Sequence, residues 1–309
     1  MNKYIRIMRL DHWIKQLFIL PGVVCAILLV NPIFDNDLLF KFVIGFIATC
    51  MIASANYVIN EYLDAEFDKF HPTKKYRTVV SEGTNGKIVW LLWTALSIGG
   101  VLLSLKVNLM FLLMEVWLWL MGLLYNVKPF RTKDIAILDV LSESVNNMIR
   151  LLLGWFIITD HAIPPCSIIL GYWMLGAFLM AIKRYAEYRM IDDKELAGHY
   201  RKSFIFYTEN SLIVSAFFYA MCSIFFIGVF LVKYRVELVL FLPFLISLFC
   251  YYFMLSFKED SSVQKPEKLY HEKKLMLYCA FLIGLFVVLM VVDIPILQIF
   301  STNEIMIIK

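Results

Sequence analysis

The chain of 309 residues is 61% hydrophobic and carries a formal net charge of +4 at pH 7. Because a soluble domain is about 45–50% apolar, this composition excludes an ordinary soluble fold and indicates a polytopic membrane protein. The six cysteines lie scattered through apolar segments without a C-x-x-C pattern, which excludes a zinc, iron–sulfur or disulfide framework.

Windows of about 20 apolar residues, the length that crosses a hydrocarbon core, predict nine membrane-spanning helices. In chain order we place them near 16–31, 38–59, 88–105, 107–125, 135–157, 166–186, 211–232, 237–256 and 275–293. We expect helices because an isolated segment in lipid satisfies its backbone polar groups only by hydrogen bonding within itself. The prediction is therefore an all-α membrane protein with a single domain over residues 1–309.

Positive charge falls mainly on one side of these spans. Most of the 29 Lys and Arg residues lie in the segments 1–15, 60–87, 126–134, 183–203 and 257–274. Cytosolic loops of membrane proteins carry such an excess. We therefore expect a multi-pass protein of the cell (inner) membrane with its N-terminus and these four loops in the cytosol. The net charge is explained by topology and by attraction to anionic lipid head groups, so nucleic acid is not an expected partner.

The stretch NEYLDAEFDKFHPTKKYR, which begins at Asn60, places charges at the end of the second span. Asn60, Asp64 and Asp68 are spaced i, i+4, i+8, so on a continuous helix their side chains lie along one face. Two carboxylates and an amide oxygen suit Mg²⁺, which completes its ligands with waters and phosphate oxygens. The cations Lys74 and Arg77 follow and can bind those phosphates. The alternative is a solvated helix end whose acids and bases balance one another.

A second polar group opens the fifth predicted span. The loop before this span is basic, with Lys128, Arg131 and Lys133. Asp139 and Glu143 then lie one turn apart, and Asn147 and Arg150 continue on nearly the same face. Charges inside a membrane helix are costly unless paired or hydrated, so they point to function. The alternative is a structural ion pair between Arg150 and Glu143.

A third group closes the sixth predicted span in the stretch KRYAEYR, which starts at Lys183 and contains Arg184, Glu187 and Arg189. Long basic side chains often reach from a span to the membrane interface, but this does not explain Glu187. All three groups fall on the same predicted face of the membrane. We therefore expect one pocket there, with apolar walls that run into the bilayer.

These residues resemble the UbiA superfamily of intramembrane prenyltransferases, which carries an N-x-x-x-D-x-x-x-D motif after its second helix and a second acidic motif near the fifth. Within it, the HPTK and nearby Arg77 resemble the decaprenyl-phosphate phosphoribosyltransferase branch. Three further stretches are similar to that branch, namely HWIKQLFILPG at 12–22, KRYAE at 183–187 and HYRKSFIFYT at 199–208. Departures are Thr78 where a proline is usual, Gln16 where an asparagine is frequent, and the polar residues Glu143 and Asn147.

The resemblance implies a nine-helix bundle around a central cavity open to the cytosolic side. It also implies transfer of 5-phosphoribosyl from phosphoribosyl pyrophosphate to a polyprenyl phosphate, with pyrophosphate released and Mg²⁺ as cofactor. The implied Mg²⁺ ligands are Asn60, Asp64 and Asp68. The implied ligands of the donor phosphates are Lys74, Arg77, Lys183 and Arg184, with Lys15 near the acceptor phosphate.

In such a reaction, positive charge builds on the sugar ring while negative charge builds on the leaving diphosphate. Asp64 and Asp68 serve the leaving group through the metal, and Asp139 or Glu143 can shield the ring, as carboxylates do in glycoside chemistry.

Two alternatives remain open at this level. The first is a prenyltransferase that moves a prenyl group from a prenyl diphosphate to an aromatic or isoprenoid acceptor, since its electrostatic demands are nearly the same. The second is a polytopic transporter, because intramembrane charges are typical of that class. Polyprenyl chain length, oligomeric state and the place of the product in cell-wall or glycan synthesis do not follow from the sequence, which is compatible with an oligomer.

Overall fold

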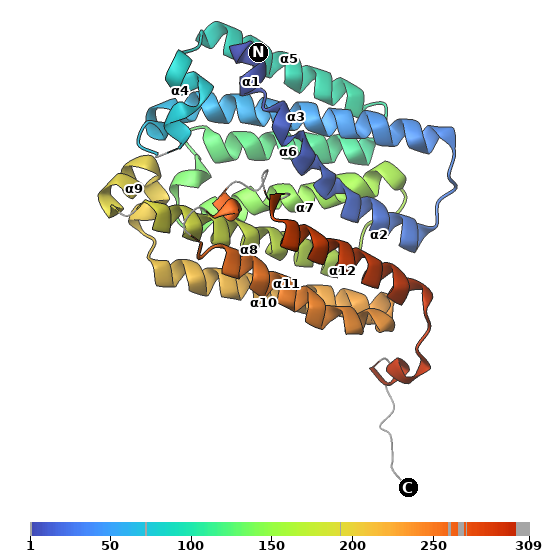
Figure 1. Cartoon of the computed structure of the whole chain (residues 1–309). Helices are drawn as coiled ribbons and strands as arrows, with labels where there is room; N and C mark the ends of the chain where they lie inside the picture. Colours follow the sequence, from blue (N-terminus) through green and yellow to red (C-terminus); the bar gives the residue numbers. More distant parts are fainter. Residues whose placement is uncertain are drawn as a thin grey trace.

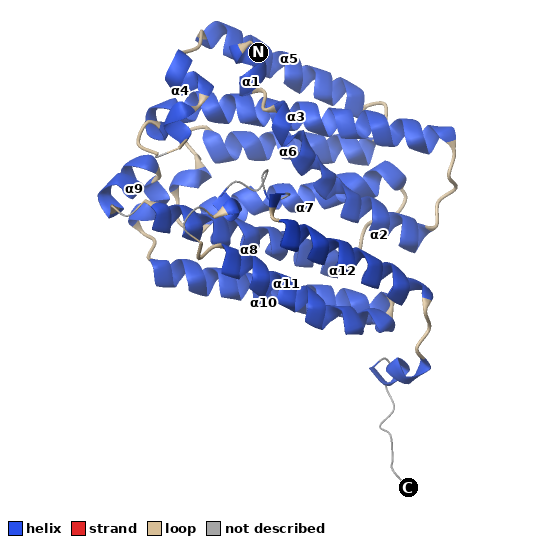
Figure 2. Cartoon of the chain, in the orientation of Figure 1, coloured by secondary structure: helices blue, strands red, loops and turns tan. Residues whose placement is uncertain are grey.

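The computed structural model describes residues 2–71, 73–191, 193–258, 261–264, 269 and 271–300 (Figure 1). All regular elements in these ranges are helices (Figure 2). The α-helices are α1 (Lys3–Ile7), α2 (Leu20–Val30), α3 (Asn36–Asp68), α4 (Thr78–Glu82), α5 (Gly86–Ser104), α6 (Leu109–Asn126), α7 (Leu138–Ile158), α8 (Cys166–Met190), α9 (Lys194–Tyr200), α10 (Glu209–Tyr234), α11 (Leu242–Leu255) and α12 (Lys273–Val291). The 3-10 helices are η1 (Leu10–Ile19), η2 (Lys74–Tyr76), η3 (Thr132–Asp134), η4 (Lys202–Ile205), η5 (Val236–Phe241), η6 (Ser262–Gln264) and η8 (Pro295–Phe300).

Eight helical segments in these ranges are long and apolar enough to cross a membrane. They correspond to eight of the nine predicted spans, so the all-α, multi-pass fold is confirmed. The remaining one, the fifth predicted span at 135–157, forms α7, which is of similar length but more polar because it carries Asp139, Glu143 and Arg150. The count of nine spans therefore stays a prediction.

Two of the predicted loops begin later than expected. Helix α3 runs without a break to Asp68, so residues 60–68 are helical and the loop starts after them. Helix α8 runs to Met190, so residues 183–190 are helical too. The predicted loop 257–274 lies partly outside the described residues. The helical extensions matter because they place the first and third polar groups on rigid elements.

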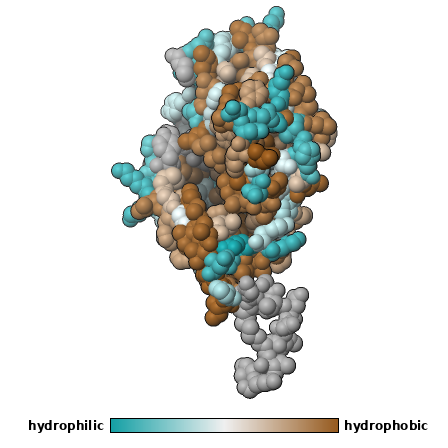
Figure 3. Space-filling model, turned by 90° about the vertical axis from the view of Figure 1, so that its right-hand side faces the viewer, coloured by the Kyte–Doolittle hydropathy of each residue, from teal (hydrophilic) through white to brown (hydrophobic). Residues whose placement is uncertain are grey.

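The outer surface of the bundle is apolar. Large side chains such as Leu91, Phe217 and Leu277 are about two-thirds or more exposed (69%, 66% and 74%). Figure 3 shows the end of the bundle away from α4 and α9, where hydrophobic residues cover most of the surface and hydrophilic residues form separate groups. Exposed apolar area on this scale is expected where lipid replaces water as the solvent.

Helix α7 lies in the centre of the bundle and packs against α2, α3, α6 and α8 (Figure 1). Its crossing with α2 depends on two glycines, as small residues allow membrane helices to approach closely. A Cβ on Gly22 would lie 1.9 Å from the carbonyl oxygen of Leu151, and a Cβ on Gly154 would lie 1.9 Å from that of Ile19. This close contact fixes η1 and α2 against α7.

The three predicted polar groups lie at one end of the bundle. The short helices α4 and α9 both lie at this end, on the left in Figure 1, beside the last turns of α3. The loops that follow α3, α6 and α8 therefore meet around one opening.

Candidate active site

A cavity of about 1270 Å³ opens at this end of the bundle. Its polar part, which we call the mouth, contains Asp64, Asp68, Lys74, Arg77, Glu187 and Arg201. Its apolar part, which we call the apolar wall, comes from α8, α11 and α12 and contains Leu175, Phe178, Leu179, Leu245, Phe249 and Leu275. Ligand pockets are usually smaller, about 300–1,000 Å³, so this cavity has room for a large amphiphilic molecule.

The three predicted metal ligands share this cavity. Asn60, Asp64 and Asp68 all line it from the last turns of α3. The Nδ2 group of Asn60 donates to Asn126 Oδ1 (2.6 Å) and to Asp64 Oδ2 (3.1 Å). The i, i+4, i+8 spacing thus brings the three side chains to one cavity because α3 is continuous through Asp68.

Asp64 is held by two cations from the segment after α6. Arg131 donates to Asp64 Oδ1 (3.0 Å), and Lys133 forms an ion pair with the same oxygen. The guanidinium of Arg131 also lies over the ring of Phe67 (4.7 Å to the centroid). Burial lowers the pKa of Lys133 to about 8, although the negative charge of Asp64 opposes the shift. Arg131 and Lys133 both belong to the basic loop predicted before the fifth span, but neither was predicted to be part of the site.

The loop after α3 folds back over the mouth. Arg77 donates to Asp68 Oδ2 (2.5 Å), and Lys74 pairs with Glu187 on α8 (2.9 Å) and hydrogen bonds to the Tyr200 hydroxyl. Burial lowers the pKa of Lys74, although Glu187 opposes the shift. The loop therefore ties α3, α8 and α9 together through charged groups.

His71 shapes this loop from within. Its Nδ1 atom accepts hydrogen bonds from the backbone N–H groups of Thr73 and Lys74, each at 3.1 Å. Its ring packs edge-on against Tyr200 with centroids 4.5 Å apart. Burial lowers the pKa of His71 to about 3, so the ring is neutral at physiological pH. A neutral ring keeps Nδ1 available as the acceptor that the loop requires.

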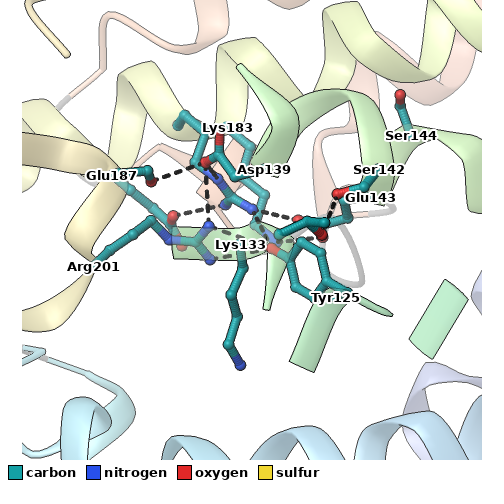
Figure 4. Close-up of polar contacts among 12 residues, drawn as sticks. Tyr125, Lys133, Asp139, Ser142, Glu143, Ser144, Lys183, Glu187 and Arg201 are labelled. Atoms are coloured by element: carbon teal, nitrogen blue, oxygen red, sulfur yellow. Dashed lines mark hydrogen bonds and ion pairs between the residues drawn. The ribbon is translucent and has the colours of Figure 1, made fainter. Parts of the chain in front are cut away.

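Arg184 belongs to a buried ion cluster. Figure 4 labels four of its partners, Tyr125, Asp139, Glu143 and Glu187. The Arg184 guanidinium is 1% exposed and donates to Asp139 (3.2 Å), Glu187 (3.0 Å) and Glu143. The Tyr125 hydroxyl accepts from Arg184 (3.0 Å) and donates to Glu143 (2.8 Å). All three carboxylates use the same guanidinium, so in this geometry Arg184 aligns α7 with α8. Its predicted role as a phosphate ligand would require it to leave these partners.

Asp139 does not lie where its predicted role requires. Its side chain is fully buried and is not among the described residues that line the cavity. Tyr207 (2.7 Å), Ser203 (3.1 Å) and Arg201 (3.3 Å) donate to it in addition to Arg184. Four donors surround this carboxylate, so in this structure it holds its neighbours in place, and its role at the sugar ring stays a prediction. Glu143, by contrast, lines the cavity and is 26% exposed at its side chain.

The remaining predicted cations also line the cavity. Lys183 lies 4.0 Å from Glu143, and Lys15 lies 3.2 Å from His12 Nδ1. Arg201 lines the mouth as well and was missed, although the stretch HYRKSFIFYT contains it. Burial would lower the pKa of Arg201, but Tyr125, Tyr200 and Asp139 together hold it well above its usual value.

The alternative ion pair between Arg150 and Glu143 is wrong. Glu143 pairs with Arg184 and Lys183 instead. Arg150 donates to the amide oxygens of Gln16 (2.8 Å) and Asn147 (3.2 Å).

The donor set on α3 fits Mg²⁺ only together with other ligands. Asn60, Asp64 and Asp68 offer hard oxygen atoms at the cavity surface, as Mg²⁺ requires. Among the described residues, however, no group of three or more His, Cys, Asp or Glu side chains could hold a metal. Such a site therefore fits a metal that also binds substrate phosphates and water, and the surrounding cations suit those phosphates.

The fold and cavity define a multi-pass membrane protein with an ion-rich pocket that continues along an apolar wall. The model of the UbiA prenyltransferase family matches residues 18–282, so the chain belongs to this family. The predicted family resemblance is thereby confirmed.

Four of the curated relatives carry the name decaprenyl-phosphate phosphoribosyltransferase. The chain is 29% identical over 216 residues to the one from Mycolicibacterium smegmatis, a match that covers 67% of this chain and 63% of that protein. It is 30% identical over 216 residues to the one from Mycobacterium tuberculosis, with 67% of each chain covered. Among solved structures, a UbiA homolog from Archaeoglobus fulgidus bound to GPP and Mg²⁺ has a TM-score of 0.70 at 18% identity, and the match covers 94% of this chain and all of that one.

Proposed function

We propose that the protein transfers 5-phosphoribosyl from phosphoribosyl pyrophosphate to a polyprenyl (decaprenyl-like) phosphate and releases pyrophosphate, with Mg²⁺ as cofactor. The observation that carries this proposal is the meeting of oxygen donors, many cations and an apolar wall in one cavity. The names of the curated relatives support the same choice. The mouth opens to the cytosol in this proposal, because the donor is a water-soluble molecule.

Asn60, Asp64 and Asp68 hold the Mg²⁺ in this scheme. When bound, the metal neutralises the leaving diphosphate and thereby lowers the barrier to its departure. Arg77 and Lys133 are paired with the two carboxylates in the structure. On binding of the donor they exchange these partners for phosphate oxygens, so the site keeps its charges balanced in both states.

The charge of the mouth favours a donor with more than one phosphate group. Phosphoribosyl pyrophosphate carries a diphosphate and a separate 5-phosphate, and the cations reach the mouth from three elements. Arg77 lies before α4, Lys183 lies on α8, and Arg201 lies just after α9. The groups beside the carboxylates are also polar, notably Asn126 and Tyr200, which suits the hydroxyls of a ribose.

The transfer itself balances without a general base. One oxygen of the acceptor phosphate forms a bond to C1 of the ribose, the C1–O bond to the diphosphate breaks, and pyrophosphate leaves with the electron pair. The acceptor phosphate is already an anion at neutral pH, so no proton must be removed from it. Of the two carboxylates predicted to shield the positive charge on the ring, Glu143 is the one that lines the cavity.

A second candidate function is prenyl transfer from a prenyl diphosphate to an aromatic or isoprenoid acceptor. The observation that favours it is the fold likeness to the Archaeoglobus fulgidus homologs, whose structures contain GPP or DMAPP with Mg²⁺. The apolar wall would then hold the chain of the donor and not that of the acceptor.

The two candidates are separated by a transfer assay on the purified full-length protein. Labelled phosphoribosyl pyrophosphate is supplied with decaprenyl phosphate and Mg²⁺, and labelled prenyl diphosphate is supplied separately with 4-hydroxybenzoate. The proposal predicts label in the lipid fraction from the first pair only. Label from the second pair alone would overturn the proposal in favour of prenyl transfer.

A further inference from the structure

The inner part of the cavity contains a cation that the proposed donor site does not use. Arg150 lies two turns of α7 beyond Glu143, about 10 Å farther along the helix. Arg150 and Asn147 both line the cavity. The cation therefore lies deeper in the bundle than the mouth and still faces the space that a ligand occupies.

Arg150 differs from the mouth cations in its partners. Lys74 and Arg77 each pair with a carboxylate. In the part of the chain that the structure describes, Arg150 instead donates to two neutral amide oxygens, through Nε to Gln16 and through Nη1 to Asn147. The nearby Glu143 is already paired with Arg184 and Lys183, so it does not offset the charge of Arg150.

An arginine whose hydrogen-bond partners are neutral amides is a favourable binding site for an anion. A guanidinium stays protonated in proteins and has five N–H donors, of which two are used here. The buried Glu115 acts on Arg150 only at longer range and accepts a hydrogen bond from Thr49. Among the described residues no carboxylate forms an ion pair with Arg150, and a charge at membrane depth without a contacting counter-charge is costly. A phosphate that approaches the unused N–H groups of this guanidinium supplies a contacting negative charge and can accept two hydrogen bonds at once.

Gln16 does not itself line the cavity, but it adds an unpaired donor directly beside Arg150. Its side chain is fully buried, and its Nε2 group has no hydrogen-bond acceptor among the described residues. Buried amide groups are nearly always paired. The contact of Gly154 with Ile19, one turn from Arg150, holds η1 so that Gln16 lies against the guanidinium.

We propose that Arg150 and Asn147, with Gln16 positioning the guanidinium, form a second anion subsite, which binds the phosphate monoester head group of an isoprenoid lipid. The isoprenoid chain then lies along the apolar wall. In the reaction proposed above this lipid is the acceptor, so that part of the inference rests on the proposed function. Two separate anion sites would let the donor diphosphate and the acceptor phosphate occupy the cavity together.

The test measures binding and needs no turnover. Geranylgeranyl phosphate and geranylgeraniol are titrated into the full-length protein in detergent, without Mg²⁺ or donor, and tryptophan fluorescence reports binding. We expect wild type to bind the phosphate about 10- to 100-fold more tightly than the alcohol, because charge-assisted hydrogen bonds to a phosphate are strong. Arg150→Gln should reduce this preference to less than about threefold and leave the affinity for the alcohol unchanged.

The matched control is Arg189→Gln, since Arg189 is exposed on α8 and lies outside the cavity lining. It should keep the full preference for the phosphate. Should Arg150→Gln not remain monodisperse, Asn147→Ala replaces it and should weaken the preference several-fold. A full preference in Arg150→Gln, or an equal loss of affinity for the phosphate and the alcohol, would overturn the subsite.

Two competitors identify the source of the anion. Millimolar inorganic phosphate should not displace geranylgeranyl phosphate, because the lipid also gains the apolar wall. Displacement by 4-hydroxybenzoate would overturn the inference and assign the subsite to an aromatic carboxylate. If the phosphate preference depends on Arg150 but the transfer assay yields no phosphoribosyl lipid, then the proposed function fails and the anion subsite stands.

Discussion

Replacement of Arg184 by methionine separates a positioning residue from a phosphate ligand. The substitution keeps an unbranched side chain about as long as the aliphatic part of the arginine and removes the guanidinium that three carboxylates share. Loss of one partner of a buried ion pair costs about 3–5 kcal/mol. The lower end applies here because Asp139 keeps Arg201, Glu187 keeps Lys74 and Glu143 keeps Tyr125. We therefore expect a loss of about 3 kcal/mol, or a melting temperature roughly 6 °C lower.

The assay is thermal unfolding in detergent followed by tryptophan fluorescence, with the KM for phosphoribosyl pyrophosphate measured on the same preparations. The matched control is Arg189→Met, since Arg189 is exposed on the same helix. A melting temperature that stays within 2 °C of wild type while the KM for the donor rises would refute the positioning role and make Arg184 a direct phosphate ligand.

Two further predictions concern the loop after α3. Lys74→Ala should raise the KM for phosphoribosyl pyrophosphate about tenfold in initial-rate assays and leave the KM for the lipid unchanged, because in the proposed scheme Lys74 binds the donor phosphates and not the acceptor. An equal rise in both constants would contradict the assignment. Burial lowers the pKa of His71 from 6.5 to about 3 in the folded protein. As the pH falls below 6.5, the unfolded chain therefore binds a proton at this residue while the folded protein does not. The free energy of unfolding drops as a result, by about 1.4 kcal/mol at pH 5.5. His71→Gln should therefore lose less melting temperature between pH 7.5 and pH 5.5 than wild type and than the control His161→Gln, whose histidine is 93% exposed, and equal losses would show that His71 does not carry the effect.

The part of the site that lies on helix α3 could be predicted from the spacing of its polar residues in the sequence. The column of Asn60, Asp64 and Asp68 was predictable because a regular helix fixes which residues share a face, and α3 continues through all three. The basic residues were likewise predictable as a group, since their bias to one side of the membrane is strong.

The partners within the site did not follow from the sequence, because they depend on how irregular segments fold back. Arg131 and Lys133 reach Asp64 only through the turn between α6 and α7. Arg201 approaches Asp139 from the segment after α9, more than 60 residues away in the chain.

The ion pairs inside the bundle could not be predicted from the sequence either. Glu143 and Arg150 are two turns apart on one helix, which makes an ion pair between them plausible from spacing alone. In the structure Arg184 of α8 forms the ion pair with Glu143 instead, and the same guanidinium also pairs with the buried Asp139. Spacing along one helix does not reveal a competitor from a neighbouring helix.

The central claim is that Asp64 and Asp68 of α3 hold a divalent cation together with a diphosphate. Its most direct test is the binding of Mn²⁺, an EPR-visible substitute for Mg²⁺, to the purified protein in the presence of pyrophosphate. We predict that Asp64→Asn and Asp68→Asn each weaken Mn²⁺ binding at least about tenfold, because each removes a charged ligand, while Asp160→Asn in the loop after α7 does not. Unchanged Mn²⁺ affinity in both α3 variants would contradict the account.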